Sequence, residues 1–222
     1  MSSSYLLRVV LPDRPGMLGA VATAVGQAGG DIVSLDVVER GPGGAVDDLL
    51  VVVPAGGLAD RLISGAQSVP GVVVESLRPY LGGSELHRDL ELVEELAADP
   101  AAGLEVLVRD APGVFRAGWA VLLELRGDAV ATLAGGPGAP DTAGLRAPWL
   151  PLAAACRLDA EQEWAPASWA RLGTELAAAP VGSEHRAVLV GRPGGPTFRG
   201  SEVLRLAHLA GIAATVSGRR RS

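Results

Sequence analysis

The chain has 222 residues, of which 48% are hydrophobic, 20% charged and 4% aromatic, and its formal net charge is −6. This hydrophobic content can build a core and argues against a disordered chain. The acidic balance disfavours a nucleic-acid-binding platform, which needs a basic face. Because domains commonly have roughly 100–150 residues, the length favours two of them.

The cysteine count and the N-terminus indicate where the protein resides. Cys156 is the single cysteine, which excludes an internal disulfide and a cysteine-rich metal site and fits a reducing compartment. No basic segment followed by a long apolar core marks a signal peptide, and no apolar run approaches the ~20 residues that span a bilayer. We therefore expect a cytoplasmic protein without membrane association.

The first eighty residues, taken as domain 1–80, alternate between strand and helix patterns. The predicted order is strand, helix, strand, strand, helix, strand, at residues 5–11, 17–29, 31–39, 47–54, 57–67 and 71–80. This βαββαβ order is the ferredoxin-like arrangement, an α+β fold with two helices on one face of an antiparallel sheet. The other face is predicted to be partly apolar, so we expect it to dimerise or to dock on the rest of the chain.

A charged turn, "DRPGML" at residues 13–18, joins the first strand to the first helix. Pro15 suits the first turn of a helix, Gly16 permits a close approach to the backbone, and Asp13 is placed to cap free N–H groups. A capped turn explains all three residues. A binding loop explains them equally well.

A second segment, "GGDIVSLDV", follows this helix and completes a family pattern. The combination is similar to the ACT domain, a regulatory module, over about residues 4–80. The matching positions are Asp13, Pro15, Gly16, Met17, Leu18, Gly29, Asp31 and Ile32. The resemblance implies a fold that forms homodimers and binds amino acids or similar small molecules near its first turn.

The residues of this turn suit a molecule that carries both a carboxylate and an ammonium group. Main-chain N–H groups of residues 16–18 would bind a carboxylate, while Asp13 and Asp31 would bind an ammonium group. A helix end contributes only ~0.3–2 kcal/mol, whereas a millimolar ligand needs ~4 kcal/mol, so backbone, carboxylates and an apolar wall must act together. The predicted ligand-binding residues are Asp13, Arg14, Pro15, Gly16, Met17, Leu18, Asp31 and Ile32.

Two members of this set have weaker support. In ACT domains that bind amino acids the position of Asp31 is commonly asparagine, and an ionised aspartate cannot donate a hydrogen bond. Arg14 is expected to be solvated, and contact with a ligand carboxylate is its alternative role.

The second half, residues 84–222, is predicted to be an α/β domain with a largely antiparallel sheet. It begins with an amphipathic helix at 85–98 and a hairpin at 117–134 whose turn contains Gly127 and Asp128. A Gly- and Pro-rich loop, short segments near 150–156 and 161–165, a strand at 185–193 and a helix at 201–216 follow. The basic tail, 218–222, is expected to be solvated, and its alternative is contact with phosphate or a membrane surface.

The end of this half contains a strand, the sequence Gly191-Arg192, then Phe198 and a helix led by Glu202. This pattern resembles the end of a GAF domain, a class that binds small molecules or nothing. We expect Cys156 to be a small buried residue rather than a chromophore anchor. His208 is expected at the surface rather than on haem, and the four tryptophans in packing rather than in a stacking cage.

These features favour a non-catalytic regulatory or sensor protein that binds an amino acid through its ACT domain, without a metal or cofactor. One alternative is an interaction module with no small ligand. Another is a regulatory subunit of an amino-acid metabolic enzyme. A protein that is itself an enzyme of amino-acid or one-carbon metabolism is disfavoured, because three scattered histidines and one cysteine show no catalytic or metal-binding spacing.

Overall fold

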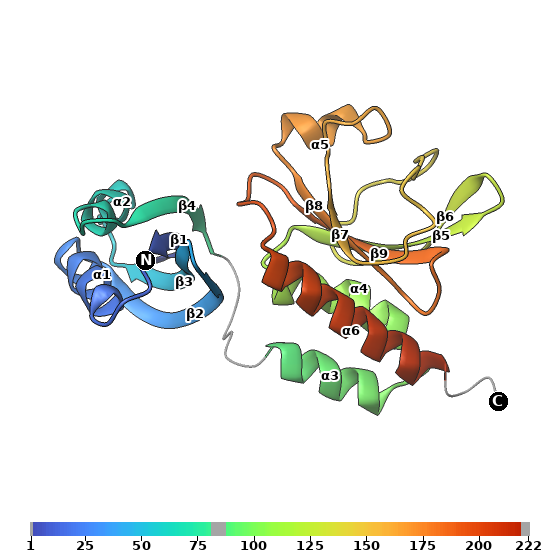
Figure 1. Ribbon diagram of the computed structural model, residues 1–222, viewed down its shortest axis with the longest axis horizontal. Coiled ribbons are helices and arrows are strands. Elements are labelled where there is room, and N and C mark those ends of the chain that lie inside the picture. Colours follow the sequence, from blue (N-terminus) through green and yellow to red (C-terminus); the bar gives the residue numbers. More distant parts are fainter. Residues whose placement is uncertain (1, 81–87, 219–222) are drawn as a thin grey trace. The chain divides into compact units, whose positions relative to one another are not determined.

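The protein is described by a computed structural model that covers residues 2–80 and 88–218 (Figure 1). The chain divides into two compact units, residues 1–86 and 87–222. Each unit has its own sheet, and each is described by itself below.

The first unit contains a four-stranded antiparallel sheet with strand order β2-β3-β1-β4. Its elements are β1 Ser3–Leu11, α1 Met17–Gln27, β2 Asp31–Gly41, β3 Gly44–Val53, α2 Asp60–Gln67 and β4 Val73–Pro79. The predicted βαββαβ order is therefore confirmed, with β2 and β4 at the two edges.

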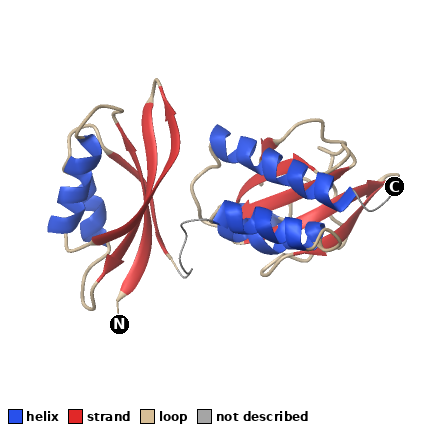
Figure 2. Cartoon of the chain, turned by 90° about the horizontal axis from the view of Figure 1, so that it is seen from below, coloured by secondary structure: helices blue, strands red, loops and turns tan. Residues whose placement is uncertain are grey.

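Both helices of the first unit cover the same face of its sheet (Figure 2). Strand side chains alternate between faces, so Leu7 and Val9 of β1 point toward the helices and are fully buried with Val21 and Val25 of α1. Arg8, between them in sequence, lies on the face away from the helices. This alternation decides which acids of β3 lie under the helices and which do not.

The second unit contains a five-stranded antiparallel sheet with strand order β6-β5-β9-β8-β7. Its elements are α3 Arg88–Ala98, α4 Gly103–Val114, β5 Trp119–Arg126, β6 Ala129–Gly135, β7 Cys156–Leu158, α5 Ala167–Arg171, β8 Glu175–Pro180, β9 Arg186–Arg192 and α6 Gly200–Gly218. The predicted hairpin is present as β5 and β6, and the predicted mixed fold with an antiparallel sheet is confirmed.

Two hydrophobic cores lie on opposite faces of this sheet. One is formed with α3, α4 and α6 and includes Phe115 and Phe198. The other lies under the long loops and contains all four tryptophans at least partly buried. Trp119 and Trp169 pack with their ring centroids 4.9 Å apart, as expected for packing residues.

Three elements were missing from the prediction: α4, α5 and β8. Helix α4 contains Gly103, Gly113 and Pro112, which hide its helical pattern. Strand β8 is "ELAAAP", and alanine has a low strand propensity, although its three alanines are fully buried. The first residues of the predicted helix 85–98 and most of the tail 218–222 lie outside the described residues.

Candidate functional site

The turn between β1 and α1 is held by its own main chain. The Arg14 N–H donates to the Pro12 carbonyl at 2.9 Å, and the Met17 N–H donates to the Arg14 carbonyl at 3.3 Å. Gly16 is the N-cap of α1 and has φ 90°, in the left-handed region that favours glycine. The turn therefore depends on a glycine at position 16.

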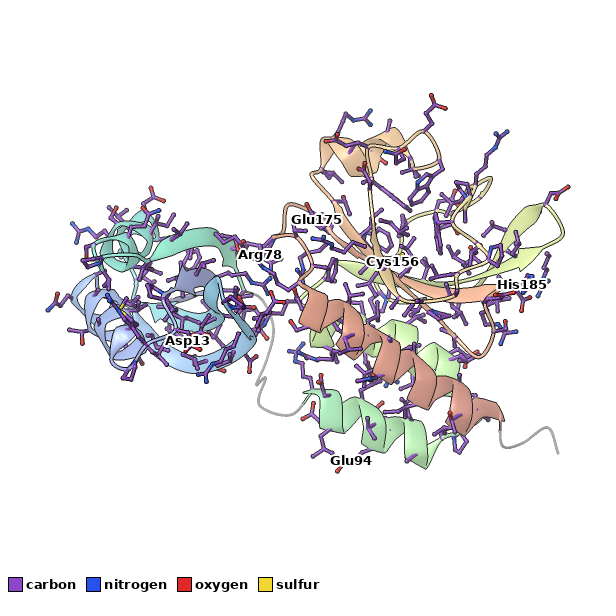
Figure 3. The ribbon with its side chains drawn as sticks, viewed as in Figure 1. Asp13, Arg78, Glu94, Cys156, Glu175 and His185 are labelled. Carbon is purple, nitrogen blue, oxygen red and sulfur yellow. The ribbon has the colours of Figure 1, made fainter. Side chains whose placement is uncertain are left out.

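The expected cap from Asp13 is wrong. The N-cap is Gly16, and no side chain caps the helix. A capping side chain must belong to the N-cap residue itself, and Asp13 comes three positions too early. Pro15 likewise precedes the helix rather than lying in its first turn. Asp13, Arg14 and Pro15 are all exposed, and Figure 3 shows Asp13 in the first unit.

Two of the three predicted main-chain donors are available. Within residues 2–80 and 88–218, the N–H groups of Gly16 and Leu18 have no acceptor, whereas that of Met17 is bonded to Arg14. Free N–H groups at a helix start attract negative charge, because the helix dipole is positive there. The side chain of Met17 is buried in the hydrophobic core of the first unit, and this contact holds the end of the turn in place.

A buried carboxylate that the sequence interpretation missed lies beside this turn. Asp47 of β3 is opposite Val9 and Val37 in register, so it lies on the face that the helices cover. It is 3% exposed, and its Oδ1 atom has no hydrogen-bond partner among the described residues. Burial raises the pKa of Asp47; Arg40 opposes this change, and the negative charges of Asp13 and Asp48 add to it.

The neighbouring acid, Asp48, is in a different situation. It points to the other face of the sheet, opposite Arg8 in register. The Arg8 guanidinium donates from Nε to Oδ1 at 2.7 Å and from Nη2 to Oδ2 at 2.8 Å, and both side chains are buried. Such a two-bond pair fixes the two side chains in one geometry. Asp48 is thus a structural partner of Arg8, whereas Asp47 has a buried carboxylate oxygen without a hydrogen-bond partner among the described residues.

The structure does not bring Asp31 and Ile32 to the same turn within one chain. Asp31 starts β2 and pairs with Val52, whereas the strand that leads to Asp13 ends at Leu11, which pairs with Ala45. At about 3.3 Å per residue, the stretch of β3 between these pairing positions spans about 23 Å. Asp13 and Asp31 therefore lie at opposite ends of the sheet.

In the second unit, the residues of the GAF-like pattern form a structural network. Arg192 donates from Nη2 to Glu202 Oε1 and to the Phe115 carbonyl, both at 2.6 Å, and from Nη1 to the Pro196 carbonyl at 2.9 Å. Its guanidinium lies 3.9 Å from the ring centroid of Phe198. The pattern thus connects the end of β9 to the start of α6.

The remaining chemistry-bearing residues are dispersed. Cys156 is half-buried in β7, less buried than expected, and burial raises the pKa of its thiol. His208 is exposed, as expected, and His185 lies far from Cys156 in Figure 3. Across the described parts of both units, no group of three or more His, Cys, Asp or Glu side chains could hold a metal ion.

Over the same residues, every helix is too short or too polar to cross a membrane.

The family model of the ACT domain matches residues 5–78. This part of the chain is therefore an ACT domain, and the prediction made from the "DRPGML" and "GGDIV" segments is confirmed. A search among curated proteins finds no significant match to the chain.

Two solved structures are similar to the chain. A GAF domain from a Pseudomonas syringae pv. tomato protein has a TM-score of 0.44 and 19% sequence identity, covering 62% of this chain and 87% of that one. A protein from Galdieria sulphuraria has a TM-score of 0.35 and 13% sequence identity, and the match covers 99% of this chain and 94% of that one. At this level of similarity neither structure carries an inference about the family or the role of this chain.

Proposed function

We propose that the chain is a non-catalytic, cytoplasmic regulatory protein whose ACT domain binds an amino acid or a zwitterion of similar size at the β1–α1 turn. The observation that carries the proposal is the buried carboxyl group of Asp47, whose Oδ1 atom has no hydrogen-bond partner among the described residues. It is near enough to Asp13 for the two charges to repel each other, and Asp13 precedes the free N–H group of Gly16 by three residues.

The two charges of an amino acid match the two sides of this turn. An α-carboxylate would accept hydrogen bonds from the N–H groups at the start of α1. The α-ammonium would compensate Asp13 and Asp47, whose mutual repulsion contributes to the raised pKa of Asp47. A buried charged group without a partner is costly, so a ligand that supplies one gains from removing that cost.

A second copy of the chain would bring Asp31 to the β1–α1 turn, and this would complete the set of ligand-binding residues predicted from the sequence. Strand β2 is at the edge of the sheet, and three of its apolar side chains, Val33, Leu35 and Val37, are exposed. An open edge with apolar side chains invites pairing with another strand. Antiparallel pairing of two β2 strands about a two-fold axis near their middle would place Asp31 of each copy at the other copy's Asp13 turn.

A thermal-shift screen of the twenty amino acids tests the proposal. A ligand at one hundred times its dissociation constant should stabilise the protein by ~2.7 kcal/mol. We expect Asp13→Asn to lose this stabilisation. The matched control is Asp60→Asn, which makes the same change in the first turn of α2 and should retain it. Sedimentation velocity on the same samples measures whether a dimer forms.

The alternative is an interaction module without a small ligand, which the exposed apolar edge of β2 also favours. If no amino acid stabilises the wild-type chain at high millimolar concentration, the ligand-binding proposal is wrong and this alternative takes its place. Equal loss of the shift in Asp13→Asn and Asp60→Asn would also contradict binding at the β1–α1 turn.

A further inference from the structure

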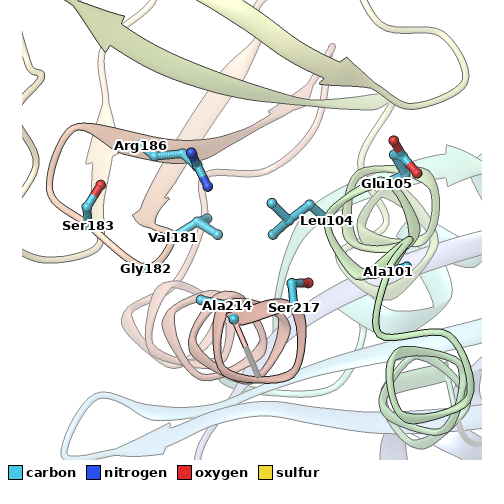
Figure 4. Close-up of a pocket in the computed structure, with 10 residues that line it drawn as sticks. Ala101, Leu104, Glu105, Val181, Gly182, Ser183, Arg186, Ala214 and Ser217 are labelled. Atoms are coloured by element: carbon cyan, nitrogen blue, oxygen red, sulfur yellow. The ribbon is translucent and has the colours of Figure 1, made fainter. Parts of the chain in front are cut away.

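A cavity of about 530 Å³ lies in the second unit on the helix-covered side of its sheet (Figure 4). Three segments line it: the start of α4, the turn between β8 and β9 together with Arg186, and the end of α6. Ligand pockets commonly have ~300–1,000 Å³. The cavity is thus of a size that accepts a small molecule, and it is separate from the turn considered above.

Small residues create the space. Gly103 lets the start of α4 approach the end of α6, because a Cβ atom at this position would lie 2.6 Å from Ser217 Oγ. Ala101, Ala214 and Gly182 line the cavity itself, and their small size leaves it open. Leu104 and Val181 supply most of its apolar wall.

A positive charge points into this cavity. Arg186 donates to Glu124 Oε1 from Nε at 3.1 Å and from Nη2 at 2.5 Å, and its Nη1 group has no acceptor within the described part of the chain. Glu124 also accepts from Arg126 Nε at 2.7 Å. One carboxylate is therefore shared by two guanidinium groups, which leaves a surplus positive charge. Figure 4 shows the Arg186 guanidinium turned toward the space between Val181 and Leu104.

Two serine residues also line the cavity. Ser217 Oγ is buried and has no hydrogen-bond partner among the described residues. Ser183 lines the rim and is exposed. Because Ser217 Oγ has almost no accessible surface and packs against Gly103, the donors that a ligand in the cavity can reach are Arg186 and the rim hydroxyl of Ser183.

We propose that this cavity binds a small aliphatic monocarboxylate. The Arg186 guanidinium would donate to the carboxylate, and Leu104, Val181 and Ala214 would contact the hydrocarbon tail. Charge-assisted hydrogen bonds of this kind are the strong ones. The exposed acid Glu105 at the rim disfavours ligands with more than one negative charge, such as phosphate. The inference concerns the second unit alone and does not depend on the proposed function.

Isothermal titration of the full chain with isovalerate, a branched five-carbon carboxylate, tests this inference. The neutral isostere isovaleramide is titrated in parallel. We expect isovalerate to bind and Arg186→Gln to weaken it at least about tenfold. Arg157→Gln is the matched control, because Arg157 is an exposed arginine of the second unit that neither lines the cavity nor contacts Glu124. It should bind as the wild type does.

A second variant tests the cavity without changing any charge. Ala214→Leu should fill the space beside Gly182 and abolish binding, while circular dichroism confirms that the fold is kept. The inference is overturned if isovalerate does not bind at up to about 10 mM. It is also overturned if the amide binds as tightly as the acid, or if Ala214→Leu binds as tightly as the wild type.

Discussion

The two units bury charged side chains in different ways. In the second unit, the buried Arg192 has a carboxylate, two carbonyl groups and an aromatic ring as neighbours. Both oxygens of Glu202 are also used, since Oε2 accepts from the Arg199 N–H at 2.8 Å. In the first unit Asp48 has a matched partner in Arg8, but the adjacent Asp47 keeps an unpaired oxygen at 3% exposure.

This difference separates structural charges from candidate functional ones. A buried ion pair holds elements in place, and losing one partner leaves an uncompensated charge. A buried acid with an unpaired oxygen weakens the fold, and such strain persists where a site needs it. By this criterion Arg192, Glu202, Arg8 and Asp48 support the fold, and Asp47 marks a site.

The largest effect is expected from breaking the network of the second unit. Glu202→Gln removes the carboxylate charge that pairs with the buried Arg192, so it should lower the free energy of unfolding by about 3–5 kcal/mol. Chemical denaturation of the full chain measures this loss. The matched control is Asp89→Asn, which breaks a pair with Arg205 in which both side chains are about half exposed.

Exposed pairs contribute little, so the control should cost less than about 1 kcal/mol. A cost for Glu202→Gln as small as that for Asp89→Asn would show that the buried network does not hold β9 to α6. The GAF-like pattern would then need an explanation other than packing.

The first unit offers a sharper contrast, because its two acids are neighbours in sequence. Asp48→Asn should destabilise the protein by about 3 kcal/mol, since it removes the charge that pairs with Arg8. Asp47→Asn should stabilise it by about 1 kcal/mol at neutral pH, because it removes a buried charge whose Oδ1 atom has no hydrogen-bond partner among the described residues. Thermal unfolding of the two variants measures whether each change in stability has the expected sign. Destabilisation by Asp47→Asn would contradict the assignment of Asp47 to a ligand site.

The stabilisation by Asp47→Asn should depend on pH. Burial raises the pKa of Asp47 in the folded protein above its ordinary value of 3.8. Between the two pKa values the folded protein binds more protons than the unfolded chain, so its stability falls as the pH rises through this range. The cost is complete above the folded pKa. The advantage of Asp47→Asn over wild type should therefore shrink as the pH is lowered toward 3.8.

The fold of the first unit could be predicted because its signals are local. Strand alternation in "YLLRVVL" and the glycines after α1 define elements that lie next to each other in sequence. In the second unit, β8 escaped prediction because its alanines are recognisable as a strand only once β7 and β9 flank them.

The candidate site was predictable only in part. The "DRPGML" segment identified the turn, but the role of Asp47 depends on the register that sets β3 against β1. The pair "DD" at the start of an apolar strand was the available signal, since one of two adjacent strand residues must face the core. Sequence also could not show that Asp31 lies at the other end of the sheet, because that depends on strand order.

The most direct test of the β1–α1 turn as a ligand site is the pKa of Asp47 with and without ligand. Carbon-13 labelling of aspartate carboxyl groups lets NMR follow this titration, with the amino acid that gives the largest thermal shift as the probe. If its ammonium group binds beside Asp47, saturating ligand should lower this pKa toward or below 3.8. An Asp47 pKa that stays raised and unchanged in the presence of saturating ligand would contradict the assignment.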